Sequence, residues 1–179
     1  MASGRSNQLT KQIGEYLVAA ELARLGLIAS TFSGNVPEYD IIATDSSFVS
    51  VPVQVKATTG TSWQFDIRRF VNVHFDGKKQ VVGDSLPVSK DIICVLVALT
   101  RYGADRFYVL SLKKLQKMLR EGHCGYLAKH GGVRPKKPDS FHCAIREKDL
   151  ARYKDKWIKT FGVQGRLLLN GIPASQTGE

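Results

Sequence analysis

The stretch DIICVLVAL at residues 91–99 constrains the fold more than any other part of the sequence. Its side chains are apolar almost without interruption, whereas a strand with one solvent-exposed face alternates apolar and polar residues. The run is far shorter than the ~18 apolar residues that a membrane-spanning helix needs. It therefore predicts a central β-strand that is buried on both faces of a sheet.

Regular spacing of apolar residues predicts the elements around this strand. Leu9, Ile13 and Leu17 lie at helical intervals and predict a helix over residues 7–26, which ends at Gly26. Alternating or β-branched runs bounded by turn residues predict strands on either side of the central one. The expected strands cover residues 27–33, 38–44, 48–57, 63–67 and 106–112, with a further hairpin around Asp76 and Gly77.

The sequence after the central strand predicts a second helix and a long loop. Ser111 is a suitable N-cap for a helix in which Leu112, Leu115 and Leu119 share one face. Glycine, proline and lysine then become frequent, so residues 123–140 are expected to form a loop.

The last part of the chain completes a single α/β domain. A final helix is expected over residues 147–161, and residues 162–179 lack a clear pattern and are expected to form a loosely held tail. No linker or internal repeat divides the sequence. We therefore expect one domain over residues 1–179, with an N-terminal helix, a mixed sheet and flanking C-terminal helices.

Charge limits the classes of partner. The chain has 26 Lys and Arg residues against 16 Asp and Glu residues, a net charge of +10 and a pI of about 9.7. This charge favours nucleic acid as a partner ahead of an anionic membrane surface, although a basic soluble protein without such a partner has the same composition. The three cysteines form no CxxC pair and the N-terminus carries no apolar signal segment. We therefore expect a cytoplasmic protein with reduced thiols and no membrane association.

An unusual set of polar residues lies on the strands that precede the central one. In the segment VPVQVKAT, Val53 and Val55 alternate with Gln54 and Lys56, so the amide and the ammonium point from the same face. Asp40 lies in the apolar stretch YDIIA, where a carboxylate costs free energy unless a partner or a metal compensates it. These polar residues are therefore candidates for a functional site.

The turn between these two strands decides whether Asp40 and Gln54 lie side by side. A three-residue loop at 46–48 places Asp40 opposite Gln54, and Lys56 then shares their face. A two-residue loop places Asp40 opposite Val53 instead, and a bulge in the second strand is then needed to restore the alignment. The hairpin is expected to gather Asp40, Gln54 and Lys56 on one patch.

The first helix offers a second carboxylate for the same patch. Glu15 has Val18 and Leu22 as helical neighbours, so it stands on the apolar side that faces the sheet. Glu21 is a weaker rival because it lies nearer the polar boundary. Gly14, next to Glu15, allows a backbone or a phosphate to approach the helix closely.

The candidate residues follow a recognisable order along the chain. A Glu on a helix comes first, an Asp on a strand comes second, and a strand with a polar residue, any residue and then Lys comes third. The segments GEYLVAAELARLGL, PEYDIIA and VPVQVKAT resemble the PD-(D/E)XK nuclease superfamily, and they are particularly similar to the archaeal Holliday junction resolvases and related small restriction-like nucleases. The resemblance covers about residues 9–67, and it implies a restriction-endonuclease-like mixed sheet with a motif core over about 7–110. Pro37 stands three residues before Asp40 instead of directly before it.

The resemblance implies a site that hydrolyses DNA phosphodiester bonds with Mg²⁺ or Mn²⁺, with Glu15, Asp40, Gln54 and Lys56 as the catalytic set. Asp40 would be the main metal ligand, Glu15 a direct or water-mediated ligand, and the carbonyl of Val55 a further ligand. Lys56 would position the attacking water or stabilise the developing negative charge. Gln54 replaces the usual Asp or Glu as a ligand or orienting group, and its missing charge weakens binding of a hard cation.

Basic clusters outside the motif are the expected DNA contacts, because Lys and Arg neutralise phosphates. The loop cluster RPKK at 134–137 is the strongest of them. A homodimer is also expected, because many nucleases of this kind pair to cut two strands. The candidate DNA-binding residues are Arg68, Arg69, Lys78, Lys79, Arg134, Lys136 and Lys137.

The sequence leaves two alternatives to a DNA endonuclease. One is a nucleic-acid-binding protein on the same fold that has lost catalysis, a reading that Gln54 favours. The other is a structural or assembly protein that uses the fold for protein contacts. For Asp40 and Lys56 alone, the plain alternative is a structural ion pair on a solvated face of the sheet.

Overall fold

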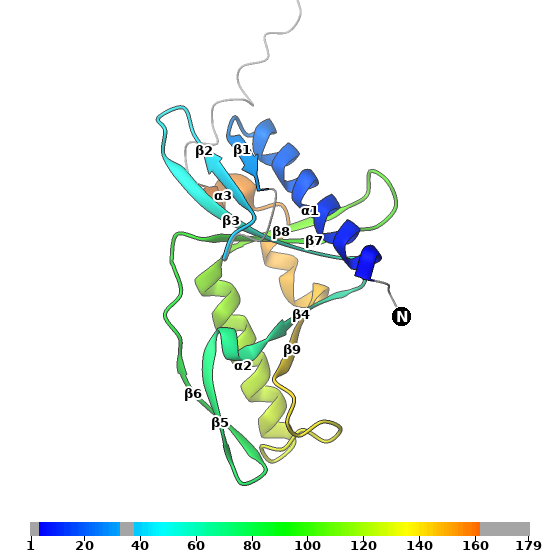
Figure 1. Cartoon of the computed structure of the whole chain (residues 1–179), viewed down its shortest axis with the longest axis vertical. Helices are drawn as coiled ribbons and strands as arrows, with labels where there is room; N and C mark the ends of the chain where they lie inside the picture. Colours follow the sequence, from blue (N-terminus) through cyan, green and yellow to red (C-terminus); the bar gives the residue numbers. More distant parts are fainter. Residues whose placement is uncertain (1–3, 33–37, 162–179) are drawn as a thin grey trace, which may run out of the picture.

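The computed structural model of the chain describes residues 4–32 and 38–161 (Figure 1). Pro37 of the nuclease-like motif and the tail expected at residues 162–179 lie outside the described residues. An N-terminal helix, a mixed sheet and C-terminal helices follow one another along the chain, so the expected α/β class is confirmed. Within the described residues, no helix combines the length and the apolar character needed to cross a membrane.

The main sheet has five strands in the order β1-β2-β3-β7-β8. Strands β1, β2 and β3 pair in antiparallel fashion, β7 is parallel to β3, and β8 is antiparallel to β7. The sheet is therefore mixed, as the sequence predicts. Its strands are β1 (Ile28–Thr31), β2 (Ile41–Thr44), β3 (Ser50–Thr58), β7 (Ile93–Ala98) and β8 (Arg106–Ser111).

Strand β7 is buried along its whole length, as its apolar sequence predicts. Its odd-numbered residues pack with Val18 and Leu22 of α1 (Gly4–Arg24) in one core. Its even-numbered residues pack with Leu115 of α2 (Leu112–Lys129) in a second core. The two cores cover the two faces of the sheet, and this explains why the strand carries no polar side chain.

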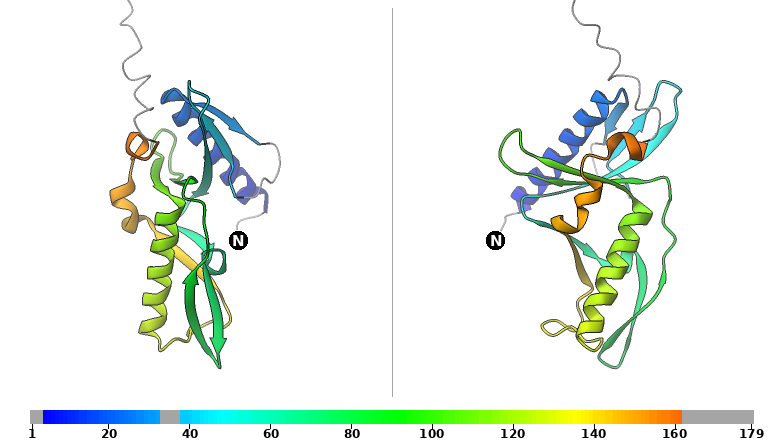
Figure 2. Two further views of the ribbon diagram at one scale, coloured as in Figure 1. Left: turned by 90° about the vertical axis from the view of Figure 1, so that its left-hand side faces the viewer. Right: turned by 180° about the vertical axis from the view of Figure 1, so that it is seen from behind.

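Two small sheets extend the second core away from α1. Strands β5 and β6 form a long hairpin that runs beside α2 to the end of the molecule farthest from α1 (Figures 1 and 2). Strands β4 and β9 pair next to it. These elements are β4 (Ser62–Asp66), η1 (Ile67–Arg69), β5 (Val71–Asp76), β6 (Lys79–Ser85), β9 (His142–Arg146), η2 (Glu147–Tyr153) and α3 (Trp157–Phe161).

The expected loop at residues 123–140 is wrong in its first part. The N-cap at Ser111 is confirmed, since its hydroxyl accepts a hydrogen bond from the Lys114 amide, but α2 continues to Lys129. Its last turns bury His123 and Leu127 against the rest of the second core. Tertiary packing therefore extends the helix through a stretch whose glycines predict an earlier end.

The region that follows this loop also differs from expectation. Strand β9 is a short element that the sequence did not predict, and its pairing with β4 gives it its conformation. The single helix expected over residues 147–161 is broken into η2 and α3. The break lies at Asp155, whose φ of +52° is incompatible with a continuous helix. Trp157 is buried, whereas Ile158 is exposed.

The inner face of α1 is the expected side that carries Val18 and Leu22, and it leaves the N-terminal apolar residues outside. Leu9 and Ile13 remain 49% and 47% exposed, whereas Gly14 and Leu22 are buried. A Cβ atom on Gly14 would lie 2.5 Å from the Cβ atom of Ala57 in β3. The helix can therefore lie this close to the strand only because residue 14 has no side chain, and this approach decides which stripe of α1 faces the sheet.

Replacement of Gly14 by Ala should lower the free energy of unfolding by about 1–3 kcal/mol, because the methyl group overpacks α1 against β3. Gly125→Ala in α2 is the matched control, since no atom lies within 4 Å of a Cβ there. That control should be stabilising by up to ~1 kcal/mol, the usual gain when a helical glycine is removed. Urea unfolding followed by circular dichroism measures both, and equal effects would contradict the tight contact.

A buried histidine makes the second core sensitive to acid. The Nε2 atom of His123 lies 3.1 Å from Oε1 of Gln80, and the side chain is almost fully buried. Burial lowers the pKa of His123, and the nearby Arg134 guanidinium lowers it further. The folded chain therefore keeps this imidazole neutral at neutral pH.

Stability should consequently fall as the pH drops below about 6.5, because the unfolded chain then binds a proton that the folded chain resists. The slope from one such group is at most ~1.4 kcal/mol for each pH unit. We expect His123→Gln, which keeps a polar partner for Gln80, to lose less of its unfolding free energy than the wild type between about pH 7.5 and 5.5. The same loss in both proteins would show that His123 does not titrate there.

Candidate functional site

The hairpin between β2 and β3 fixes the position of Asp40. Its loop has three residues, since Asp45 pairs with Val49 through a 3.0 Å hydrogen bond. The Asp45 carboxylate accepts hydrogen bonds from the amides of Ser47 and Val49, and Phe48 closes the loop with a φ of +62°. The register from Ile41 opposite Val53 to Thr44 opposite Ser50 is the one that a three-residue loop gives. Asp40 directly precedes this ladder, and its amide donates to the carbonyl of Val53.

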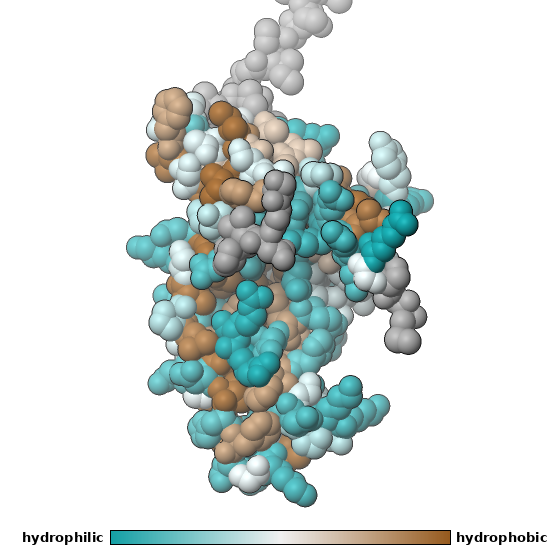
Figure 3. All heavy atoms as spheres, viewed as in Figure 1, coloured by the Kyte–Doolittle hydropathy of each residue, from teal (hydrophilic) through white to brown (hydrophobic). Residues whose placement is uncertain are grey.

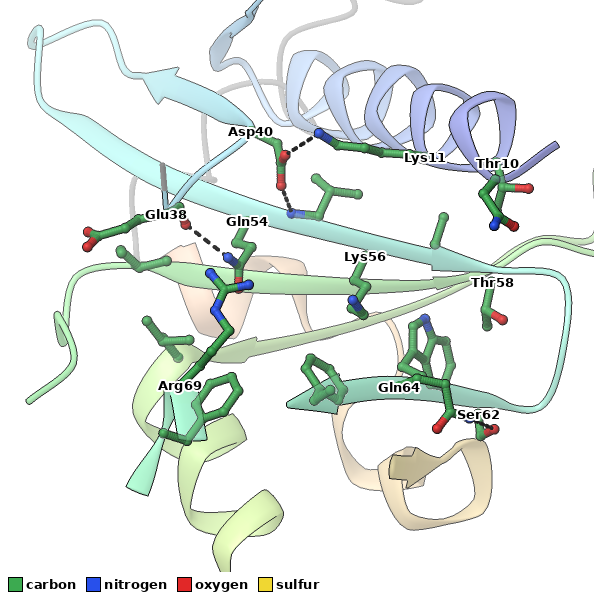
Figure 4. Close-up of a pocket in the computed structure, with 18 of the residues that line it drawn as sticks. Thr10, Lys11, Glu38, Asp40, Gln54, Lys56, Thr58, Ser62, Gln64 and Arg69 are labelled. Atoms are coloured by element: carbon green, nitrogen blue, oxygen red, sulfur yellow. Dashed lines mark hydrogen bonds and ion pairs between the residues drawn. The ribbon is translucent and has the colours of Figure 1, made fainter. Parts of the chain in front are cut away.

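The Asp40 carboxylate completes the hydrogen bonding of β3 where β2 begins. Its Oδ2 atom accepts a 2.8 Å hydrogen bond from the amide of Val55. A side chain thus takes the role that a backbone carbonyl has elsewhere in the ladder. This bond holds Asp40 at the edge of β3, with its second oxygen, Oδ1, left for other partners (Figure 4).

Lys11 joins Asp40 to Glu15. Its Nζ atom lies 3.3 Å from Oδ1 of Asp40 and 3.3 Å from Oε1 of Glu15. Burial alone would lower the pKa of Lys11, but the carboxylates of Asp40 and Glu15 outweigh it and raise the pKa above its ordinary value. The ammonium is therefore a counterion that brings the two carboxylates together from different elements.

Glu15 is the less well satisfied of the two acids. Burial raises the pKa of Glu15, the nearby Asp40 carboxylate raises it further, and Lys11 opposes both effects only in part. Its Oε1 atom is buried and makes no hydrogen bond, so its contact with Lys11 is an ion pair without hydrogen-bond geometry. A cation other than Lys11 could therefore gain from this oxygen.

Two contacts hold the side chain of Gln54, one to the segment before β2 and one to β7. Its amide nitrogen donates to the carbonyl of Glu38 at 3.1 Å, and its Oε1 accepts from the thiol of Cys94 at 3.8 Å. Burial, with a smaller effect of Asp40, raises the pKa of the Cys94 thiol to about 12, so the thiol keeps the proton that it donates. The amide is thus orientated by the sheet behind it.

Lys56 lies beside Gln54 with its ammonium 5.0 Å from the centre of the Phe65 ring. Burial lowers the pKa of Lys56, the Arg69 guanidinium lowers it further, and the Asp40 carboxylate opposes them. No ion pair to Lys56 occurs within the part of the chain that the structure describes. Lys56 and Arg69 both line the pocket and lie close enough to repel each other, an arrangement that favours a bound anion.

These side chains border one open pocket of about 870 Å³ between the N-terminal half of α1, β3, β4 and the residues before β7 (Figure 4). Glu15 does not line it and stands behind Lys11. The pocket brings together Lys11, Asp40, Gln54, Val55, Lys56 and Arg69.

The remaining candidate DNA-binding residues lie outside this pocket. Arg68 turns away from it, because its guanidinium binds the Asp66 carboxylate and covers the Phe141 ring. The basic residues of the β5–β6 turn and of the loop after α2 lie at the far end of the molecule (Figure 1). Sequence reasoning missed Lys11, although its spacing of four residues from Glu15 is the common one for a helical ion pair.

The oxygen atoms near Asp40 are of the type that binds a hard cation, but there are few of them. Within residues 4–32 and 38–161, no group of three or more His, Cys, Asp or Glu side chains is placed to hold a metal ion. Glu15 and Asp40 supply two carboxylates, and the amide of Gln54 and the backbone of Val55 border the same pocket. Oxygen donors of this type are those that Mg²⁺ prefers, and Lys11 already contributes one positive charge between the acids.

Comparison with known proteins gives a distant likeness to solved structures. No family model matches the chain, and no curated protein matches it. The fold is similar to a solved structure of a bacterial homing endonuclease, I-Ssp6803I, at 17% sequence identity and a TM-score of 0.42, over 63% of this chain and 73% of that one. A likeness of this size does not indicate an activity for this chain.

Replacement of Lys11 by Met should lower the free energy of unfolding by about 1 kcal/mol or less, because Glu15 and Asp40 then repel each other and the pair is partly exposed. Lys117→Met is the matched control, since Lys117 and Glu121 form an exposed pair at the same helical spacing, 3.8 Å apart. That control should change stability by less than ~0.5 kcal/mol.

The double variant Lys11→Met/Glu15→Gln checks the cause, because it removes the repulsion along with the counterion. Its unfolding free energy should be at least that of Lys11→Met alone. A double variant that is less stable than the single one would mean that Lys11 does not act by neutralising the two acids. Urea unfolding at neutral pH measures all four proteins.

Proposed function

We propose that the protein is a metal-dependent endonuclease that hydrolyses phosphodiester bonds of DNA in the pocket around Asp40. The observation that carries this proposal is the joint placement of Asp40 and Lys56. The β2–β3 hairpin brings the acid and the amine to one open pocket, and Lys56 forms no ion pair within the described residues. A carboxylate held beside an available ammonium is an arrangement that suits a phosphate and its counterion.

The two pocket cations are the proposed phosphate ligands. Arg69 offers a planar guanidinium that suits two phosphate oxygens at once, and Lys56 offers a compact point charge beside it. Burial lowers the pKa of Lys56 and the Arg69 guanidinium lowers it further, and a bound phosphate would relieve the repulsion between the two cations. The net charge of +10 favours the approach of a polyanion to this site.

Mg²⁺ or Mn²⁺ is the proposed cofactor, and Asp40 and Glu15 would hold it with help from Gln54 and the carbonyl of Val55. When bound, such an ion lowers the pKa of a water molecule and relieves negative charge at phosphorus. Lys11 would have to swing away from the two carboxylates, which its half-exposed side chain allows. The neutral Gln54 favours a single ion over a pair of ions.

A nucleic-acid-binding protein without catalysis is the second candidate. Two observations favour it. Gln54 directs its amide oxygen to the Cys94 thiol, and Lys11 already neutralises the charge of Asp40 and Glu15. A pocket with these features binds a phosphate through Lys56 and Arg69 without any metal.

Incubation of the pure protein with supercoiled, linear and branched DNA, with and without Mn²⁺, tests the proposal. Lys56→Ala should reduce cleavage by roughly 100-fold, as removal of a group that stabilises a transition state does, and binding should largely persist. Asp40→Asn should also abolish cleavage, while its amide oxygen can keep the hydrogen bond to the Val55 amide. Lys148→Ala, an exposed lysine outside the pocket, is the control and should cut at the wild-type rate.

Gln54→Glu separates the two candidates, because it restores the carboxylate that the nuclease-like motif usually has. In an active enzyme, this change should lower the Mg²⁺ concentration needed for half-maximal cleavage. Cleavage by Gln54→Glu but never by the wild type would favour the binding protein. A wild type that neither cuts nor binds any DNA or RNA would overturn both.

A further inference from the structure

Four exposed lysines lie together at the end of the molecule farthest from α1. Lys78 lies in the turn of the β5–β6 hairpin, Lys79 is the first residue of β6, and Lys136 and Lys137 belong to the loop that follows α2. Both segments meet at the lower end of Figure 1, and hydrophilic residues cover the loop in Figure 3. These four residues are called the end surface below.

Gln80 fixes the two segments of the end surface to each other. It is only 4% exposed, and its backbone amide donates to the carbonyl of Gly132 at 2.9 Å. Its side-chain amide donates to the carbonyls of Pro138 and Ser140 at 2.8 and 3.0 Å. His123 holds the remaining oxygen of this amide. The loop is therefore fastened to the hairpin by a buried and fully used side chain.

Close packing strengthens this connection. Gly132 has a φ of +84°, and a Cβ atom there would lie 3.3 Å from the aliphatic stem of Lys79. Arg134 anchors the loop, since its guanidinium donates to the carbonyl of His142 and lies 5.2 Å from the centre of the Tyr126 ring. Arg134 is thus a structural residue, and the lysines around it are the charges that remain available.

The end surface has an excess of positive charge that the described residues do not neutralise. None of its four lysines forms an ion pair with an acid in residues 4–32 or 38–161. Asp76 and Asp139 are exposed acids in the same two segments, so four cations stand against two anions. Lysine is a strongly hydrated point charge that binds phosphate without reading bases.

The hairpin sets the separation between the end surface and the Asp40 pocket. Phe70 lines the pocket, and β5 begins at the next residue and ends at Asp76, beside the turn. At ~3.3 Å for each residue, the turn lies about 20 Å from the rim of the pocket. This distance matches about six base pairs of a duplex, at ~3.4 Å for each pair.

We propose that the end surface binds the backbone of a nucleic-acid duplex about six base pairs from the phosphate that occupies the Asp40 pocket. This inference rests on the proposed function in one respect only, namely that a phosphate binds in the Asp40 pocket. A rigid pair of segments held by Gln80 suits a stiff duplex, whose phosphates keep fixed distances, better than a flexible single strand. The end surface would thus set the minimum length of the substrate.

A variant with Lys78, Lys79, Lys136 and Lys137 changed to Ala tests this proposal. Its affinity for a duplex of about 30 base pairs should fall roughly tenfold or more near 100 mM salt, and the slope of log affinity against log salt should drop by about 3 to 4, at ~0.9 for each phosphate contact. The control removes the same charge from η2, α3 and the residues between them, which lie on the back of the molecule (Figure 2). Its four changes are Lys148, Lys154, Lys156 and Lys159 to Ala, and its salt slope should stay near that of the wild type.

Duplex length supplies the second measurement. The deficit of the end-surface variant should vanish with duplexes clearly shorter than about six base pairs, which cannot reach both surfaces. An equal deficit at every length, or equal salt slopes in the variant and the control, would overturn the proposal. Binding is the readout, so a protein that cuts nothing still gives a result. Normal cleavage with an unchanged slope would defeat this inference and leave the proposed function intact.

Discussion

The hydrogen bond from the Val55 amide to the Asp40 carboxylate is the interaction on which the site depends. It forms where β2 begins, so it exists only if the β2–β3 hairpin has the register that its three-residue loop imposes. The same bond fixes which carboxylate oxygen faces Lys11 and α1. This one contact therefore links the pairing of the backbone to the position of the Asp40 side chain, and so to the charge of the pocket.

Much of the fold follows from local patterns in the sequence. The uninterrupted apolar run of β7 predicts a strand buried on both faces, and Ser111 predicts the start of α2. The register of Asp40 and Gln54 follows from counting residues across a turn, because side chains alternate strictly along a strand. The catalytic roles of Glu15, Asp40, Gln54 and Lys56 come from the nuclease-like motif and stay a prediction.

Features that arise from contacts between distant segments could not be predicted from local sequence patterns. The close approach of Gly14 to Ala57, which leaves Leu9 and Ile13 half-exposed, does not follow from the helical spacing of apolar residues. Strand β9 owes its conformation to β4, and α2 is extended by the burial of His123. Lys11 is an ordinary helical lysine until the fold brings Asp40 within its reach.

Lys11 would also give the proposed metal site a preference among ions. Because it is tethered four residues from Glu15, its ammonium is present at a high effective concentration beside both acids. A monovalent ion such as K⁺ carries the same charge as the ammonium and would lose translational entropy on binding, so it would not displace Lys11 from the two carboxylates. A divalent ion brings a second charge that the tethered ammonium cannot match. At the proposed metal site, the helix would thus discriminate between ions by valence before any coordination geometry is involved.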